Sequence, residues 1–219
     1  MNHVVVDLEM CKVNKRTRRE HGYRCNMETI QIGAVMLDEE YNEISSFSVY
    51  VRPEYGEIDW VIANLTGIHD SNVKNAPALD DAVRMFLNWV GDREARYYAW
   101  SDTDYNQLLN EVVLKDIDDE RIMALMDADW CDYQKVFDTR FEMESATGLK
   151  LALDLCGIDP DGHAHNGLDD ARNTGKLIAM LEQDGEYELP AIFIDARKEE
   201  VEPLQYSMAS LFDGLKLAQ

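Results

Sequence analysis

The sequence predicts an α/β domain in which helices flank a mixed β-sheet. The first half of the chain holds three strand-like runs, at residues 3–9, 28–37 and 43–52. The spacing of apolar residues then changes to that of a helix over residues 79–90, and strand and helix candidates alternate from there on. Strands followed by alternating strands and helices are typical of layered domains with a mixed sheet.

The three N-terminal runs differ in character. The run over residues 3–9 is short and rich in valine, which suits a central strand covered on both faces. Residues 28–37 and 43–52 are separated by a polar turn over residues 38–42. Pro53 ends the third run because proline cannot donate a hydrogen bond to a β-ladder.

The remaining elements follow from helical spacing and capping residues. The helix over residues 79–90 stops at Gly91, and residues 96–100 form the next strand. Ser101 or Asp102 can cap the helix that follows. Further helices are expected over residues 117–126, 149–156 and 167–181.

The composition fits one globular domain with room for an appended element. The chain has 219 residues, of which 46% are hydrophobic and 29% are charged. No apolar run approaches the roughly eighteen residues that a membrane span needs. The first residues lack the basic region and the cleavage site of a secretory signal. We therefore expect a soluble protein that does not associate with a membrane.

The cysteines indicate a reducing compartment. Cys11, Cys25, Cys131 and Cys156 form no CxxC pair and have no metal-ligand spacing. Disulfides are rare in the cytosol, and buried, reduced thiols are the ordinary state of such cysteines there. We therefore expect a cytoplasmic protein.

The chain is strongly acidic, except for one basic segment. The net charge is −22, from 21 basic and 43 acidic side chains. This argues against broad adhesion to nucleic acid, which depends on neutralising phosphates, but not against a nuclease whose metal ions supply local positive charge. In residues 12–24 the balance reverses, because a single acid, Glu20, faces Lys12, Lys15, Arg16, Arg18, Arg19 and Arg24.

Asp7 and Glu9 lie two positions apart at the end of the first predicted strand. Alternation along a strand puts both side chains on the same face. Two carboxylates held together in a low dielectric repel each other, which raises their pKa unless a cation lies between them. A divalent metal ion is the simplest such cation. The alternative is that the strand ends here and both acids point to water.

A histidine, His165, precedes the last predicted helix, and two aspartates lie in the first turn of that helix. Asp170 shares a helix face with Leu177, which looks inward, whereas Asp169 aligns with Arg172, which looks outward. Acids in a first turn also suit the helix dipole. That effect accounts for Asp169, but it does not account for an inward carboxylate close to a histidine.

A further acid opens the helix after residues 96–100. Asp104 aligns with Leu108 and Val112 on the apolar face of this helix. Asp102 is better placed to cap the helix. We therefore assign Asp104, rather than Asp102, as the inward ligand.

Together these residues resemble the three exonuclease motifs of the DnaQ-like DEDDh family, in the same order and spacing. The resemblance covers about residues 3–183 and also includes residues 28–35, 65–68, 76–77 and 148–150. Residues 165–173 are most similar to the branch that trims small RNAs and histone messages. A histidine separated from the final aspartate by four residues distinguishes this branch from relatives that use a tyrosine, and only His165, not His163, has this spacing.

The resemblance implies an RNase H-like fold, with a five-stranded mixed sheet flanked by helices, over residues 1–183. Residues 184–219 form a C-terminal extension without an assigned role. It implies a 3′–5′ exonuclease that releases 5′-mononucleotides from single-stranded RNA or DNA ends. RNA is favoured over DNA because that branch prefers it.

The resemblance also implies the catalytic groups. Two Mg²⁺ or Mn²⁺ ions are expected, and hard oxygen ligands suit both metals. One ion activates a water and the other stabilises the departing 3′ oxygen. His165 is the general base, since an ordinary histidine titrates near neutral pH. The expected metal ligands are Asp7, Glu9, Asp104 and Asp170.

Substrate contacts are assigned to two groups of residues. Met10, Leu65 and Thr66 lie beside the motifs. Residues 12–24 begin next to the expected metal ligands and are long for a connection between strands. Candidates for phosphate contacts in this segment are Lys12, Lys15, Arg16, Arg18 and Arg19. The alternative is a solvated, flexible loop.

Three alternatives for the function stay open. The acidic surface favours an oligoribonuclease-like enzyme that degrades very short fragments, which need few phosphate contacts. A non-catalytic module that binds nucleic acid or protein can keep the same fold, although all five chemical positions are present here. A proofreading subunit of a polymerase is the third. Residues 206–217 are amphipathic, and they suit a helix that packs on the domain or, alternatively, one that contacts a partner.

Overall fold

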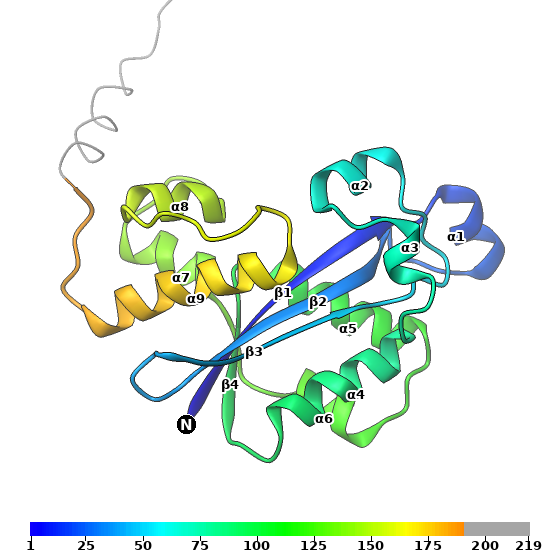
Figure 1. The fold of residues 1–219 in the computed structure, drawn as a ribbon, viewed down its shortest axis with the longest axis horizontal. Coiled ribbons are helices and arrows are strands. Elements are labelled where there is room, and N and C mark those ends of the chain that lie inside the picture. Colours follow the sequence, from blue (N-terminus) through cyan, green and yellow to red (C-terminus); the bar gives the residue numbers. More distant parts are fainter. Residues whose placement is uncertain (191–219) are drawn as a thin grey trace, which may run out of the picture. The chain divides into compact units, whose positions relative to one another are not determined.

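The computed structural model describes residues 1–190, of which residues 1–187 form one compact unit. Within this described part, the strands form one five-stranded sheet in the order β3-β2-β1-β4-β5 (Figure 1). Strand β2 is antiparallel to β1 and β3, whereas β4 is parallel to β1 and β5. The predicted mixed sheet is confirmed. The strands are β1 (Asn2–Lys12), β2 (Met27–Leu37), β3 (Glu43–Tyr50), β4 (Ala95–Ala99) and β5 (Trp130–Asp132).

The helices that the sequence predicted are present. They are α4 (Leu79–Val90), α5 (Asp102–Leu114), α6 (Glu120–Met126), α8 (Leu149–Leu155) and α9 (Gly167–Gln183). Strand β5 and four short helices were not predicted from the sequence. These helices are α1 (Lys15–His21), α2 (Trp60–Thr66), α3 (Asp70–Val73) and α7 (Tyr133–Arg140). These helices span only four to eight residues, too few to show a clear apolar period.

The basic segment after β1, expected as a loop, contains a short helix. Helix α1 begins after Asn14, whose side chain accepts a hydrogen bond from the Thr17 N–H at 2.9 Å. It ends at Gly22, whose φ of 67° lies in the left-handed region. No residue of α1 is buried. Its amino acids therefore carry no apolar pattern from which the helix could have been predicted.

Strand β1 runs through the centre of the sheet and is covered on both faces. Val4, Val6 and Leu8 pack into a core with side chains from α4, α5 and α6. Side chains alternate along a strand, so Asp7 and Glu9 face the opposite side, where α9 packs on β1 and β2 (Figure 1). The two acids therefore point toward α9, as the strand alternation predicted.

The amphipathic segment, residues 206–217, lies outside the described residues. Among residues 1–190, no helix combines the length and the apolar character that crossing a membrane requires.

Candidate active site

Four carboxylates and a histidine from three parts of the chain line one cleft of about 740 Å³. Asp7 and Glu9 come from the end of β1, Asp104 from the first turn of α5, and Asp170 from the first turn of α9. His165 lies in the loop just before α9. The structure thus brings together the acids and the histidine that the sequence singled out.

Asp104 is buried and is tied to the strand that carries the first two acids. Its Oδ1 accepts a hydrogen bond from the Leu8 N–H at 3.0 Å. Asp102 instead lies at the surface, where its Oδ2 is 2.7 Å from Nζ of Lys135. The N-cap of α5 is Ser101, whose Oγ accepts from the Thr103 N–H. Ser101, and not Asp102 as preferred from the sequence, therefore caps the helix, whereas Asp104 lines the cleft as predicted.

Helix α9 reaches the cleft through a very close contact with β2. A Cβ added at Gly33 would lie 2.1 Å from the carbonyl carbon of Gly167, which leaves no room for any side chain there. The Gly167 N–H donates to Oε1 of the buried Gln31 at 3.1 Å. These contacts hold the first turn of α9, with Asp170, over the end of β1. The role of Gln31 in positioning the site was not predicted from the sequence.

We expect Gly33→Ala to displace α9 and disrupt the site. The methyl group would meet backbone atoms, which cannot swing aside as a flexible side chain can. Overpacking of this kind costs about 1–3 kcal/mol, so thermal unfolding should occur at a lower temperature and metal-dependent activity should fall. Gly185→Ala is a matched control, since nothing lies within 4 Å of its added Cβ. Equal unfolding temperatures and equal activities of the two variants would show that this contact does not position α9.

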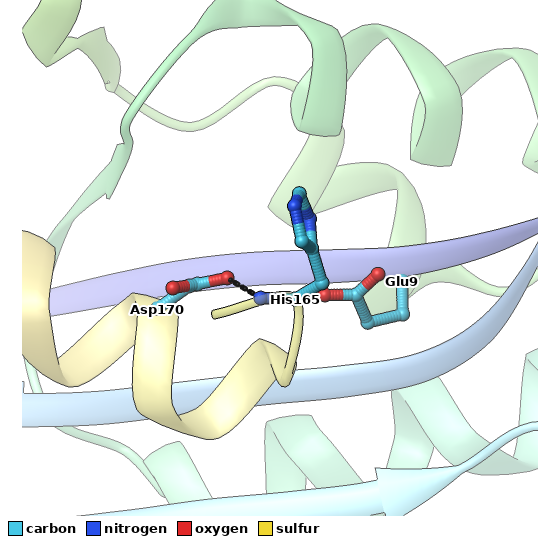
Figure 2. A group of neighbouring side chains, drawn as sticks. All are labelled: Glu9, His165 and Asp170. Atoms are coloured by element: carbon cyan, nitrogen blue, oxygen red, sulfur yellow. Dashed lines mark hydrogen bonds between the residues drawn. The ribbon is translucent and has the colours of Figure 1, made fainter. Parts of the chain in front are cut away.

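The histidine and two of the acids form a compact group. Ligand atoms of Glu9, His165 and Asp170 all lie within 4.8 Å of one another. His165 has a left-handed φ of 64°, and its backbone N–H donates to Oδ2 of Asp170 at 2.7 Å. Figure 2 shows the imidazole ring projecting away from α9, with the Glu9 and Asp170 carboxyl groups beside the His165 backbone. His163 is linked instead to Asp169, through its own N–H.

The acids of the cleft lie in an environment that disfavours their charged forms. Burial and the nearby acids raise the pKa of Glu9 to about 8, and burial raises the pKa of Asp104 to about 7. Burial, followed by the charges of Asp104, Glu9 and Asp170, raises the pKa of Asp7 well above its usual range. Burial also raises the pKa of Asp170. Clustered carboxylate oxygens that repel one another are the ligands that a hard divalent cation neutralises, so this donor set fits such an ion.

The residues expected to contact substrate fall into two places. Met10, Leu65 and Thr66 line the same cleft as the acids. Lys12, Lys15 and Arg18 line a separate groove, and Arg19 lines a shallow pocket with two of them. Arg16 pairs with Glu20 at 2.7 Å on the exposed side of α1. The basic side chains therefore do not lie in the cleft itself.

Other residues line the cleft without having been assigned a role. They include Leu149, Lys150 and Leu153 of α8, together with Trp100, Pro160 and Gly162. Gly148, Leu149 and Lys150 resemble the corresponding residues of the exonuclease family. That likeness was the signal that could have placed α8 at the cleft.

A buried polar network behind the cleft was also not predicted. Glu111, two turns after Asp104 on α5, accepts hydrogen bonds from the N–H and the hydroxyl of Thr29 at 2.7 and 2.6 Å. Thr29 pairs with Met10 on β1, just past a β-bulge that follows Glu9. Helix α5 is thus attached to β1 through Asp104 and to β2 through Glu111. This double attachment fixes the end of β1 that carries the acids.

Comparison with known proteins identifies relatives of the whole domain. The model of the exonuclease family (RNase_T) matches residues 4–178. The 3′-5′ exoribonuclease 1 of Rattus norvegicus is 27% identical over 164 residues, which cover 72% of this chain and 48% of that protein. ERI1 exoribonuclease 2 of Xenopus laevis is 27% identical over 206 residues, covering 83% of this chain and 28% of that protein. The chain thus spans about half, or less, of the length of these relatives.

Solved structures share the fold. The nuclease domain of 3′hExo, a DEDDh family member bound to rAMP, superposes with a TM-score of 0.70 at 21% identity, covering 86% of this chain and 96% of that one. Cell-death related nuclease 4 superposes with a TM-score of 0.68 at 18% identity, covering 84% and 64%. The DEDDh exonucleases depend on divalent metal ions, in accord with the acidic cleft. This chain belongs to the exonuclease family and has the RNase H-like fold of the DEDDh 3′-exonucleases.

Proposed function

We propose that residues 1–183 form a metal-dependent 3′–5′ exonuclease that releases 5′-mononucleotides from single-stranded RNA or DNA ends. The observation that carries this proposal is the convergence of Asp7, Glu9, Asp104, Asp170 and His165 on one cleft. Membership in the exonuclease family and the 3′-5′ exoribonuclease relatives support the same activity.

The four carboxylates would hold two Mg²⁺ or Mn²⁺ ions. When bound, such a pair supplies an activated water and stabilises charge on both the attacking and the leaving oxygen. Oxygen donors suit both metals, which keep several waters and bind substrate phosphates as well. The Leu8 N–H holds the Asp104 carboxylate, and the His165 N–H holds that of Asp170. Both carboxylates are therefore oriented before any ion binds.

His165 would act as the general base that takes a proton from the attacking water. Its side chain lies next to Glu9 and Asp170 and is exposed to solvent. An exposed base can pass the proton on to bulk water after each cycle. Its backbone bond to Asp170 keeps the residue at the cleft while leaving the ring nitrogens available.

Single-stranded ends, with RNA favoured over DNA, would be the substrate. Met10, Leu65 and Thr66 line the cleft beside the acids and would contact the terminal nucleotide. The exoribonuclease relatives support RNA, whereas some structural neighbours were solved with DNA. Cys11, Cys25, Cys131 and Cys156 all carry free thiols, which supports a cytoplasmic location.

We expect His165→Ala to lower the rate of mononucleotide release by about 100- to 10,000-fold, the usual contribution of a general base. Release would be measured on 5′-labelled single-stranded RNA in the presence of magnesium. The stabilisation of the protein by added metal should persist, because the four carboxylates remain.

His163→Ala is the matched control for this variant. His163 is also an exposed histidine of the same loop, but it does not line the cleft. Its removal should leave the rate within about twofold of wild type, since it touches none of the reacting groups. A rate for His165→Ala that equals that of His163→Ala would remove His165 from the mechanism.

One observation favours the narrower alternative, an enzyme for very short fragments. The chain carries a net charge of −22, and Lys150 is the single lysine or arginine among the described residues that line the cleft. Few phosphate contacts suffice for a very short fragment. The dependence of activity on substrate length separates this alternative from the main proposal.

A further inference from the structure

A groove of about 440 Å³ lies next to the cleft, along helix α1. Lys12, Lys15 and Arg18 line it together with Asn14, Met27, Glu57 and Asp59. The Lys12 backbone pairs with Glu57, which brings the segment before α2 against the end of β1. Figure 1 shows α1, α2 and α3 at the same end of the domain.

The cations of α1 have few partners in the protein. Within residues 1–190, no ion pair is formed by Lys15, Arg18 or Arg19. The Nε of Arg18 is buried and has no hydrogen-bond partner among the described residues. The groove also holds two acids, Glu57 and Asp59, and Asp59 lies 3.9 Å from Nζ of Lys12, so its three cations exceed its acids by one charge. The cations are therefore available to an anionic ligand.

An exposed tryptophan follows, in the sequence, a residue that lines this groove. Trp60 directly follows Asp59, and it is 79% exposed, the most of any large hydrophobic residue in the described part of the chain. It opens helix α2, and Ile62, Leu65 and Thr66 of the same helix line the acidic cleft. Helix α2 therefore connects the basic groove with the cleft.

Met27 lines both the groove and the cleft, so the two depressions are separated by a single side chain there. A polyanion whose end lies among the acids of the cleft can thus continue over Met27 into the groove. Cations that follow a backbone, combined with an exposed aromatic ring for stacking, are the features with which proteins bind single strands without reading their sequence. An acidic peptide would use the cations but would leave Trp60 without a stacking partner.

We propose that the α1 groove and Trp60 form a binding track for the nucleotides that lie 5′ of the one in the cleft. This inference rests on the proposed exonuclease function and adds to it a preference for longer strands. Arg18, Arg19 and Lys15 neutralise phosphates of the strand, and Trp60 stacks on a base. On a protein with a net charge of −22, such a local basic surface also guides an anionic strand to the one side where it can bind.

The track is tested by binding, independently of catalysis. Fluorescence anisotropy in EDTA would give the affinity for a dinucleotide and for a 16-nucleotide single-stranded RNA, at several salt concentrations. The variants are Arg18→Ala/Arg19→Ala and Trp60→Ala, with Trp60→Phe as the conservative replacement. Arg93→Ala/Arg121→Ala removes two cations outside the groove and is the charge-matched control.

We expect the Arg18→Ala/Arg19→Ala variant to bind the 16-mer at least tenfold more weakly than the control. Its slope of log affinity against log salt should fall by about 1.4, since each lost phosphate contact on a single strand contributes about 0.7. Trp60→Ala should weaken binding by about 5- to 100-fold, the range of one base–aromatic stack, and Trp60→Phe should restore most of it. Binding of the dinucleotide should change by less than twofold in every variant.

Equal affinity and equal salt slope for Arg18→Ala/Arg19→Ala and the control would overturn the track. So would an undiminished affinity of Trp60→Ala for the 16-mer. Failure of the exonuclease proposal has a different signature, because wild type with magnesium would then release no mononucleotide from either substrate. A wild type that degrades both substrates while the variants bind normally would refute the track alone.

Discussion

Asp7→Asn is expected to lower the rate of nucleotide release by about 1,000-fold or more. The change keeps the size of the side chain but removes one negative ligand from the cleft. A metal ion at such a site contributes several kcal/mol of charge stabilisation in the transition state, and each 1.36 kcal/mol corresponds to a factor of ten in rate. The rate would be measured under single-turnover conditions on 5′-labelled RNA with magnesium.

The same variant should be more stable than wild type when metal is absent. Burial and the charges of Asp104, Glu9 and Asp170 raise the pKa of Asp7, so its ionised form is unfavourable in the folded protein. Removing that charge should raise the melting temperature at pH 8 by about 2–4 °C for each kcal/mol gained. A variant that is inactive merely because it is misfolded would melt at a lower temperature.

Asp102→Asn provides the matched control. Asp102 lies two residues before Asp104 on the same helix but is exposed and pairs with Lys135. Its replacement should leave both activity and metal-free stability close to those of wild type, because exposed ion pairs contribute about 0–1 kcal/mol. Comparable losses of activity in the two variants would contradict the assignment of Asp7 to the metal site.

Added magnesium or manganese should stabilise the folded protein, and more strongly at pH 8 than at pH 5. The folded-state pKa values of Asp104 and Glu9 are raised to about 7 and about 8. In the folded state these groups hold protons that the unfolded chain has already lost, so metal-free stability falls as the pH rises from about 4.5 to 8. Metal binding replaces those protons and is therefore weak at pH 5.

An ion at 100 times its dissociation constant stabilises the folded state by about 2.7 kcal/mol, which corresponds to a rise in melting temperature of roughly 5–10 °C for a domain of this size. Thermal unfolding at both pH values, with metal or EDTA, measures it. At each pH the effect of metal would be taken as the difference between the melting temperatures with metal and with EDTA, which cancels titrating groups that metal binding does not affect. A metal effect that is equal at pH 5 and pH 8 would contradict the coupling of protons and metal.

Much of the sheet and of the site followed from local patterns. Strand alternation placed Asp7 and Glu9 on one face, and helical spacing turned Asp104 and Asp170 inward. Periodicity also predicted α4 and α9 and the mixed sheet. These features depend on residues close in sequence, whose spacing determines which side is buried.

The parts that could not be predicted depend on contacts between distant residues or on helices without an apolar face. Gln31 holds the N-terminus of α9 from 136 positions away, and Glu111 holds Thr29 from 82 positions away. Neither residue belongs to a local pattern that would reveal its partner. Helix α1 buries no side chain, so its capping by Asn14 and Gly22 becomes evident only in the structure.

The central claim is that this chain removes nucleotides one at a time from a free 3′ end in a metal-dependent reaction. The most direct test compares 5′-labelled single-stranded RNA and DNA with a circular strand of the same sequence, in magnesium, manganese or EDTA. We predict a ladder of products shortened from the 3′ end, with 5′-mononucleotides released, for the linear strands and only with metal. Cleavage of the circle, or no shortening of either linear strand with either metal, would contradict the account.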